Sequence, residues 1–231
     1  MRHRHYLPLL AITASLSPPL HAESLRLDAS EVSATVSDPT APSAAETRAE
    51  YAKIPGGASV VESASYKTGR SGSPQDALGL ATGVYVQPRF GADESRLAIR
   101  GSGLNTFYQG YVLGIKFLYD GLPLTGPGGT QEDMLDMASV DHTEVLYGAN
   151  AYLYSALSLG GAINFVSKTG RTDPGNYARL EAGSFGYRKQ QLSTGGVVGD
   201  SDYYVSVLHN QRDGYQDDSS NKGQGLVANF G

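Results

Sequence analysis

Within residues 171–231, apolar side chains recur at every second position in three stretches. The recurring positions are Ala178, Leu180 and Ala182, then Tyr203, Val205 and Val207, and then Leu226, Ala228 and Phe230. Turn dipeptides separate these stretches, at Gly199-Asp200 and Asp213-Gly214. A period of two predicts β-strands. Lipid-facing barrel strands and a soluble sheet with one wet face both produce this pattern, so the alternation alone leaves both open.

Residues 51–170 carry shorter apolar runs between turn residues, which predicts one compact α+β unit. Ser73 and Pro74 are typical of a helix start, and Asp120-Gly121 is a strong turn dipeptide. A further helical turn or two is expected over 131–140. The strands are expected at 59–61, 83–86, 96–100, 117–119, 143–147 and 162–167. About 120 residues can enclose a modest hydrophobic core.

The first 22 residues have the order of a secretory signal peptide. A basic start is followed by a short apolar stretch, two prolines and Ala22, after which cleavage is expected. The other reading is a short buried N-terminal helix. No run approaches the ~20 apolar residues of a membrane-spanning helix.

Residues 23–50 are rich in Ser, Ala, Thr and Glu and poor in large apolar side chains. Such a segment buries too little surface to offset its ordering entropy, so it is expected to be mobile. Residues 30–36 mix small and β-branched side chains and have extended character. A linker with accidental β-propensity is the other reading of this stretch.

Charge and cysteine content exclude several classes. The net charge is −5; removing two arginines with the leader leaves 16 basic against 23 acidic residues, a net charge of −7. A nucleic-acid partner would require a clustered basic surface, so none is expected. Cysteine is absent, and an exported chain without it must rely on burial and strand pairing for its stability.

Catalytic and metal-binding patterns are not found. The Gly101-Ser-Gly103 stretch lacks the third glycine of a dinucleotide fingerprint, and no Gly-x-Ser-x-Gly elbow occurs. His142 has acidic neighbours but no His-x-x-x-His or cysteine spacing, and it is expected to be a surface or sheet-edge histidine. The sequence therefore indicates a protein that is not an enzyme and needs no cofactor or metal.

Four segments carry the most specific signal when they are taken in order. They are 96–101, 119–124, 140–150 and 159–166. Together they resemble the plug domain of TonB-dependent outer-membrane receptors, in the branch that includes ferric citrate and other ferric-chelate (siderophore) receptors. The chain departs from the family at Tyr147, where Arg or Lys is usual, at Ala149, where Pro is common, and at Ser155, where Gly is usual.

The resemblance implies an α+β plug, a mixed sheet with short helices, followed by the first strands of a transmembrane β-barrel. The domains would be a signal peptide at 1–22, a mobile segment with a TonB box at 23–50, a plug at 51–170 and three to four barrel strands at 171–231. The box would pair with TonB, which an inner-membrane complex energises, by strand addition through Glu31, Val32, Ser33, Ala34 and Thr35. In this reading Val32→Pro abolishes uptake, whereas Ser43→Ala, outside the box, is silent.

Two further roles follow from the resemblance. Arg100 and Glu144 occupy positions at which the family's plug is locked to the barrel; for Arg100 the alternative is an ordinary solvated charge at a strand end. An anionic ferric chelate would be met by the plug's outward loops, through charge, planar hydrogen bonding and aromatic contact. The expected ligand contacts are Arg89, Tyr108, Gln109 and Tyr111; the alternative is that they serve only the folding of these loops.

The length of the chain limits what it can form by itself. A spanning strand takes about 9–11 residues and the smallest barrels have about eight strands, whereas residues 171–231 number 61. A plugged lumen belongs to barrels of about 22 strands. The chain is therefore expected to be a fragment or truncated product of an outer-membrane receptor. The alternatives are TonB-dependent uptake of a non-iron ligand such as cobalamin, and a soluble periplasmic plug-only binding module.

Overall fold

The computed structural model describes residues 42–69, 71–89, 94–102, 114–126, 129–130, 135–154, 158–214 and 220–231. All of them belong to the unit formed by residues 37–231. The expected signal peptide, the extended segment with Glu31 to Thr35, and residues 103–113 lie outside the described residues.

Helix α1 (Ala44–Tyr51) is the first described element. Ser43 caps it: the Ser43 hydroxyl accepts from the Glu46 amide at 3.3 Å, and the Glu46 carboxylate accepts from the Ser43 amide at 2.9 Å. This reciprocal capping box stabilises the first helical turn. The prediction of a mobile segment through residue 50 is therefore wrong for residues 44–50. Because Ser43 is the cap of α1, Ser43→Ala is expected to destabilise this helix, and its silence in uptake stays a prediction.

A five-stranded mixed sheet forms the centre of the α+β unit expected at residues 51–170, which is called the plug below after the resemblance stated above. Its order is β1 (Ala58–Glu62), β8 (Val140–Tyr147), β9 (Gly161–Ser167), β4 (Ile115–Tyr119) and β5 (Leu122–Pro123). The β4–β9 pair is parallel and the other pairs are antiparallel. These strands confirm the runs predicted at 59–61, 117–119, 143–147 and 162–167.

The predicted Asp120-Gly121 turn joins β4 to β5. Both residues have positive φ, 48° and 76°, the values of a type I′ hairpin turn. Asp120 Oδ1 accepts from the Ser167 amide at 2.7 Å, and the Gly121 amide donates to Asn164 Oδ1 at 2.9 Å. The turn is thereby fixed to β9.

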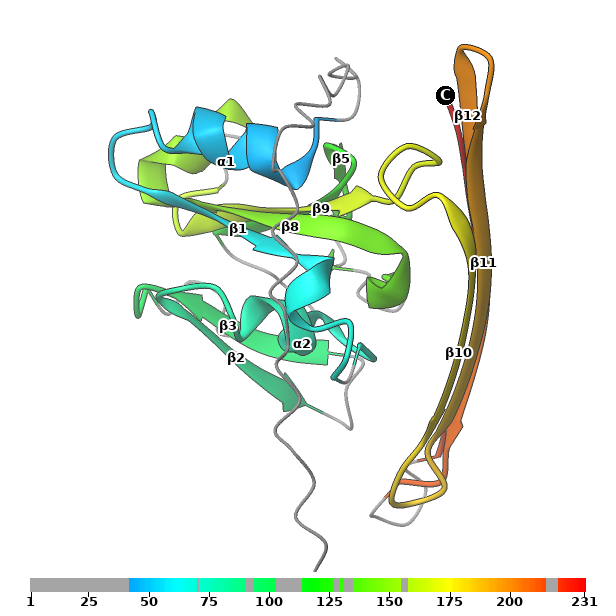
Figure 1. The fold of residues 1–231 in the computed structure, drawn as a ribbon. Coiled ribbons are helices and arrows are strands. Elements are labelled where there is room, and N and C mark those ends of the chain that lie inside the picture. Colours follow the sequence, from blue (N-terminus) through cyan, green and yellow to red (C-terminus); the bar gives the residue numbers. More distant parts are fainter. Residues whose placement is uncertain are drawn as a thin grey trace, which may run out of the picture. The chain divides into compact units, whose positions relative to one another are not determined.

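Both faces of the sheet are covered (Figure 1). On one face α2 (Pro74–Leu78) and the hairpin of β2 (Val84–Arg89) and β3 (Glu94–Ile99) enclose the larger core. On the other face α1 and the 3₁₀ segment η4 (Gly148–Leu153) cover a smaller cluster. The larger core includes Leu78, Leu97, Phe117, Val145 and Phe165; the smaller includes Leu118, Leu146, Ala151 and Ala162.

Short elements complete the plug. They are η1 (Ser63–Ser65), the two-residue strands β6 (Thr125–Gly126) and β7 (Gly129–Thr130), and η3 (Met137–Ser139). Of the helical turn or two expected over 131–140, the described residues 135–140 contain the 3₁₀ turn η3, and residues 131–134 lie outside the described residues. Strand β8 already begins at Val140.

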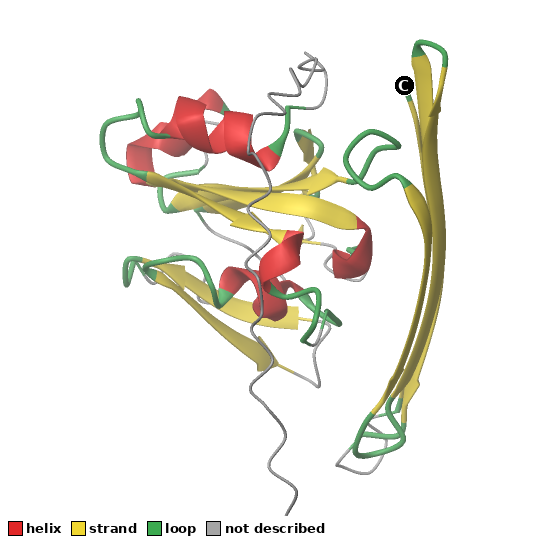
Figure 2. Ribbon diagram, in the orientation of Figure 1, coloured by secondary structure: helices red, strands yellow, loops and turns green. Residues whose placement is uncertain are grey.

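Residues beyond the plug form a separate four-stranded antiparallel sheet of consecutive strands, long and curved in Figure 2. They are β10 (Gly175–Ala182), β11 (Arg188–Val198), β12 (Ser201–Arg212) and β13 (Asn221–Phe230). Three of them are the strands that the alternation predicts. The fourth, β11, was not singled out from the sequence, because its Ser, Thr, Gln and Gly residues hide the period of two.

In this sheet the buried face is polar and the exposed face is apolar, which is the reverse of the arrangement in a soluble protein. Leu180 is 82% exposed and Leu226 70%, whereas Gln191 is 1% exposed and Lys189 2%. The buried set continues with Ser193, Asp202, Tyr204 and Ser206, and the exposed set with Leu192, Val207 and Phe230. A soluble sheet with one wet face would bury its apolar side, so the pattern favours strands that are polar inside and lipid-facing outside. Among the described residues, no helix is long and apolar enough to cross a membrane.

Candidate functional site

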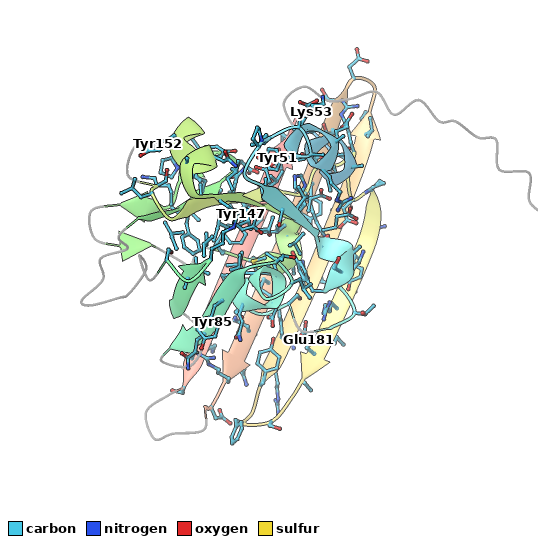
Figure 3. All side chains as sticks on the ribbon, turned by 90° about the vertical axis from the view of Figure 1, so that its left-hand side faces the viewer. Tyr51, Lys53, Tyr85, Tyr147, Tyr152 and Glu181 are labelled. Carbon is cyan, nitrogen blue, oxygen red and sulfur yellow. The ribbon has the colours of Figure 1, made fainter. Side chains whose placement is uncertain are left out.

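Glu144 is a buried carboxylate on the α1 side of β8. It accepts hydrogen bonds through Oε2 from the Tyr51 hydroxyl at 2.8 Å, Asn164 Nδ2 at 3.0 Å and the Tyr154 hydroxyl at 3.3 Å. Burial by itself raises the pKa of Glu144, but hydrogen bonds from His142, Asn164 and Tyr51 outweigh it and hold the pKa below its usual range. The group is therefore ionised, and it ties α1, η4 and β9 together (Tyr51 in Figure 3).

His142 is fully buried beside Glu144, which corrects the expectation of a surface or sheet-edge histidine. Its Nδ1 lies 2.8 Å from Asp141 Oδ2, and its Nε2 lies 3.5 Å from Glu144 Oε1 and 3.4 Å from the Thr47 hydroxyl of α1. Burial lowers the pKa of the imidazole, but hydrogen bonds to Asp141 and Glu144 raise it to about 9. At neutral pH an imidazolium therefore lies between two carboxylates underneath α1.

Arg100 occupies a strained position at the end of β3. Its φ is 50°, in the left-handed region that non-glycine residues rarely adopt. Its guanidinium donates to the Gly56 carbonyl at 2.8 Å and lies 4.4 Å from the centre of the Tyr147 ring. Tyr147 (Figure 3) thus meets Arg100 through its π face.

The predicted plug–barrel lock stays a prediction. The hydrogen bonds and ring contact described above for Arg100 and Glu144 all lie within the plug. None of those partners belongs to β10–β13. The four described strands instead reach the plug through other side chains.

Two basic side chains of β10 and β11 make some of these contacts. The Arg179 guanidinium donates to the Lys67 and Gly69 carbonyls. Lys189 Nζ donates to the Ser71 carbonyl at 2.7 Å and lies 3.6 Å from Asp136 Oδ1. Sequence reasoning missed both residues, although each falls on the polar set of an alternating strand.

A cavity of about 470 Å³, lined by both polar and apolar residues, lies between the plug sheet and strands β12 and β13. Three carboxylates, those of Asp120, Glu144 and Asp202, line it together with Asn164 and Asn229. Asn229 Nδ2 bridges the two sides by donating to the Ser167 hydroxyl at 3.0 Å. No group of three or more His, Asp or Glu side chains suited to a metal ion occurs in the described part of the chain.

Of the four predicted ligand contacts, Arg89 alone has a backbone within the described residues. Tyr108, Gln109 and Tyr111 lie outside the described residues. Arg89 ends β2, where its backbone is paired with Glu94, and its side chain lies outside the described part. These four residues remain predictions.

Sequence comparison identifies relatives of the plug. Residues 51–162 match a family model described as the TonB-dependent Receptor Plug Domain. The ferric-pyoverdine M114 receptor PbuA of Pseudomonas sp. (strain M114) is 36% identical over 99 residues, which are 41% of this chain and 12% of that protein. The ferripyoverdine receptor of Pseudomonas aeruginosa is 29% identical over 129 residues, 54% of this chain and 14% of the receptor. A vitamin B12 transporter BtuB of Vibrio cholerae is 23% identical over 141 residues, 60% of this chain and 22% of the transporter.

Solved structures share the fold. The open form of the ferric-catecholate import receptor Fiu from E. coli K12 gives a TM-score of 0.55 at 20% identity, covering 75% of this chain and 24% of Fiu. A pyoverdine-bound FpvA of P. aeruginosa gives 0.53 at 23% identity, covering 69% of this chain and 21% of FpvA. The chain thus spans less than a quarter of the length of each of these relatives.

Proposed function

Residues 51–162 are a plug domain of the TonB-dependent receptor family, and from this premise we propose that the protein acts in the active uptake of a ferric siderophore across the outer membrane. Family relatives are outer-membrane proteins. The observation that carries the proposal is the order of a plug followed by strands whose polar side chains face inward and whose apolar side chains face outward. That polarity matches a wall between a polar lumen and lipid.

The proposed ligand class rests on the relatives. The two pyoverdine receptors match at 36% and 29% identity, against 23% for the vitamin B12 transporter. A ferric siderophore is an anionic chelate, which Arg89 and the amide and aromatic groups of Gln109, Tyr108 and Tyr111 suit chemically. No residue in this role needs to be catalytic, because the receptor binds and releases its ligand unchanged.

Growth of a deletion strain tests the ligand class. Cells lacking the full-length gene are supplied, under iron limitation, with ferripyoverdine, a ferric catecholate or ferric citrate as the sole iron source. A parallel culture of a cobalamin auxotroph is supplied with limiting vitamin B12. The proposal predicts loss of growth on one ferric chelate and normal growth on vitamin B12. Loss of growth on vitamin B12 alone would assign the receptor to a non-iron ligand.

TonB coupling is proposed to act through Glu31 to Thr35. Strand addition needs a main-chain donor and an extended backbone, and proline removes the donor and fixes φ. Val32→Pro in the full-length receptor is expected to abolish uptake and leave equilibrium binding intact. Val32→Thr is the matched control, because it keeps the amide and the β-branched shape. Wild-type uptake by the proline variant would show that the coupling segment lies elsewhere.

Cell fractionation tests the proposed location. The native protein is expected in the outer-membrane fraction, since the exposed face of β10–β13 carries Leu180, Leu192 and Leu226. Recovery of the protein in the soluble periplasm would favour a plug-only binding module instead.

A further inference from the structure

The plug segment from Lys67 to Ser71 is the place where cations of the sheet meet the plug. Three carbonyl groups of this short segment, those of Lys67, Gly69 and Ser71, accept from Arg179 and Lys189. Arg179 extends from β10 and Lys189 from the adjacent β11. Two neighbouring strands of the sheet therefore donate hydrogen bonds to one short stretch of plug backbone.

Lys189 makes the more demanding of the two contacts because it is buried. The residue is 2% exposed, and its ammonium group has the Ser71 carbonyl at 2.7 Å and the Asp136 carboxylate at 3.6 Å. A buried cation is stable only where charge and hydrogen-bonding partners compensate it. These partners come from two plug segments far apart in sequence, so the ammonium group joins both of them to β11.

Each of these two plug segments lies directly before an element that packs in the core. Asp136 also caps η3, accepting from the Ala138 amide at 3.1 Å and the Ser139 hydroxyl at 2.8 Å, just before β8 starts. Ser71 lies two residues before Ser73, the cap of α2. Loss of the Lys189 ammonium group would therefore remove a contact from both plug segments. Arg179 instead contacts two carbonyls of one of these segments and pairs with Glu181 on its own strand.

We propose that Lys189 is a positioning residue that seats the plug against the barrel wall through Asp136 and Ser71, and that this joint keeps the lumen closed at rest. The inference rests on the proposed receptor function for the meaning of the closed state. In this proposal the contact that holds the plug against the barrel wall is made by residues other than Arg100 and Glu144.

Charge compensation provides the test. Lys189→Met removes the cation, keeps most of the side-chain length and leaves the Asp136 carboxylate buried without it. Adding Asp136→Asn removes that carboxylate while keeping a side chain that can cap η3. Lys222→Met, at an exposed position of β13, is the matched control for loss of one lysine.

The full-length receptor is examined by two readouts that need neither siderophore nor TonB. One is amide hydrogen exchange at residues 67–73 and 135–140 in the purified receptor; the other is the sensitivity of cells to vancomycin, which is too large to cross an intact outer membrane. Lys189→Met is expected to accelerate exchange at both segments by at least ~10-fold and to sensitise cells, with the double variant returning towards wild type. Lys222→Met should match wild type in both.

Exchange in Lys189→Met that equals that of Lys222→Met would overturn the inference, as would acceleration without vancomycin sensitivity. If Lys189→Met does not form a folded barrel, the double variant Lys189→Met/Asp136→Asn provides the test. A folded barrel in the double variant supports the contact of Lys189 with Asp136, and an unfolded one overturns the inference. Because neither readout involves ligand, a failed uptake assay would refute the proposed function without affecting this result.

Discussion

The charged cluster beneath α1 predicts a pH dependence that can be worked out from the structure. His142 is buried between Asp141 and Glu144, and its pKa is raised from 6.5 to about 9. A group whose folded pKa lies above its unfolded pKa contributes stability that is fully present below the unfolded value. That stability is lost as pH rises through the folded value. The window is therefore from about pH 6.5 to somewhat above pH 9.

The size of the effect follows from the same shift. A rise from 6.5 to about 9 corresponds to about 3 kcal/mol of stabilisation by protonated His142. His142 and Glu144 titrate as a coupled pair, so this energy belongs to the pair and is counted once. Because Thr47 and Tyr51 of α1 contact these two side chains, deprotonation of His142 should destabilise the packing of α1 on the sheet.

Hydrogen exchange of α1 in the full-length receptor measures the prediction. Protection factors of amides 44–51, taken against intrinsic rates at each pH, are expected to fall roughly 100-fold between pH 6.5 and 9.5, which is what about 3 kcal/mol predicts. His142→Gln should remove most of this dependence, whereas His209→Gln in β12 should retain it. Equal protection at the two pH values, or an unchanged dependence in His142→Gln, would refute the buried imidazolium.

Three further predictions concern other parts of the structure. Ser43→Ala should destabilise α1 by about 1 kcal/mol through loss of the capping box, seen as lower protection of the first helical turn than in Ser37→Ala. Gly161→Ala should destabilise the plug by roughly 1–3 kcal/mol in denaturant titrations, because φ is 145° and a Cβ would lie 2.7 Å from both Ile99 Cδ1 and the Leu146 carbonyl. At Gly101 a Cβ would meet nothing within 4 Å, so Gly101→Ala should destabilise the plug less. Equal destabilisation by the two variants would contradict the packing argument. Leu180→Arg should lower the folding free energy of the barrel, measured in a refolding assay, by roughly 2–4 kcal/mol if the residue lies near the bilayer midplane. Leu180→Val should leave that free energy unchanged. Normal assembly of Leu180→Arg would contradict a lipid-facing position.

Elements with a strong local signal could be predicted from the sequence. The Asp120-Gly121 turn and the Ser73-Pro74 helix start are determined by backbone preferences of a few residues, and both are found where expected. Strand β11 was missed because its inward set, Lys189, Gln191 and Ser193, is polar and does not stand out from the polar background. A search for alternating polarity rather than alternating apolarity could have found it.

Tertiary contacts were the least predictable part. The burial of His142 depends on α1, whose residues look too polar to fold and are held by a cap and by contacts with β8. The contact of Lys189 with Asp136 joins strand β11 to the plug across more than 50 residues of sequence, which no local pattern reveals. For Arg100, the sequence placed the residue at a strand end, but its contact with the Tyr147 ring depends on the fold.

The most direct test of the proposed function is uptake of radiolabelled ferripyoverdine by cells whose only pyoverdine receptor is the full-length protein. Binding on ice and uptake at growth temperature are measured on the same cells, with and without a proton uncoupler. The proposal predicts saturable binding under both conditions, and accumulation only without the uncoupler and only in cells that contain TonB. Accumulation that persists with the uncoupler or without TonB would contradict energy-coupled transport, and the absence of binding would contradict a pyoverdine-type ligand.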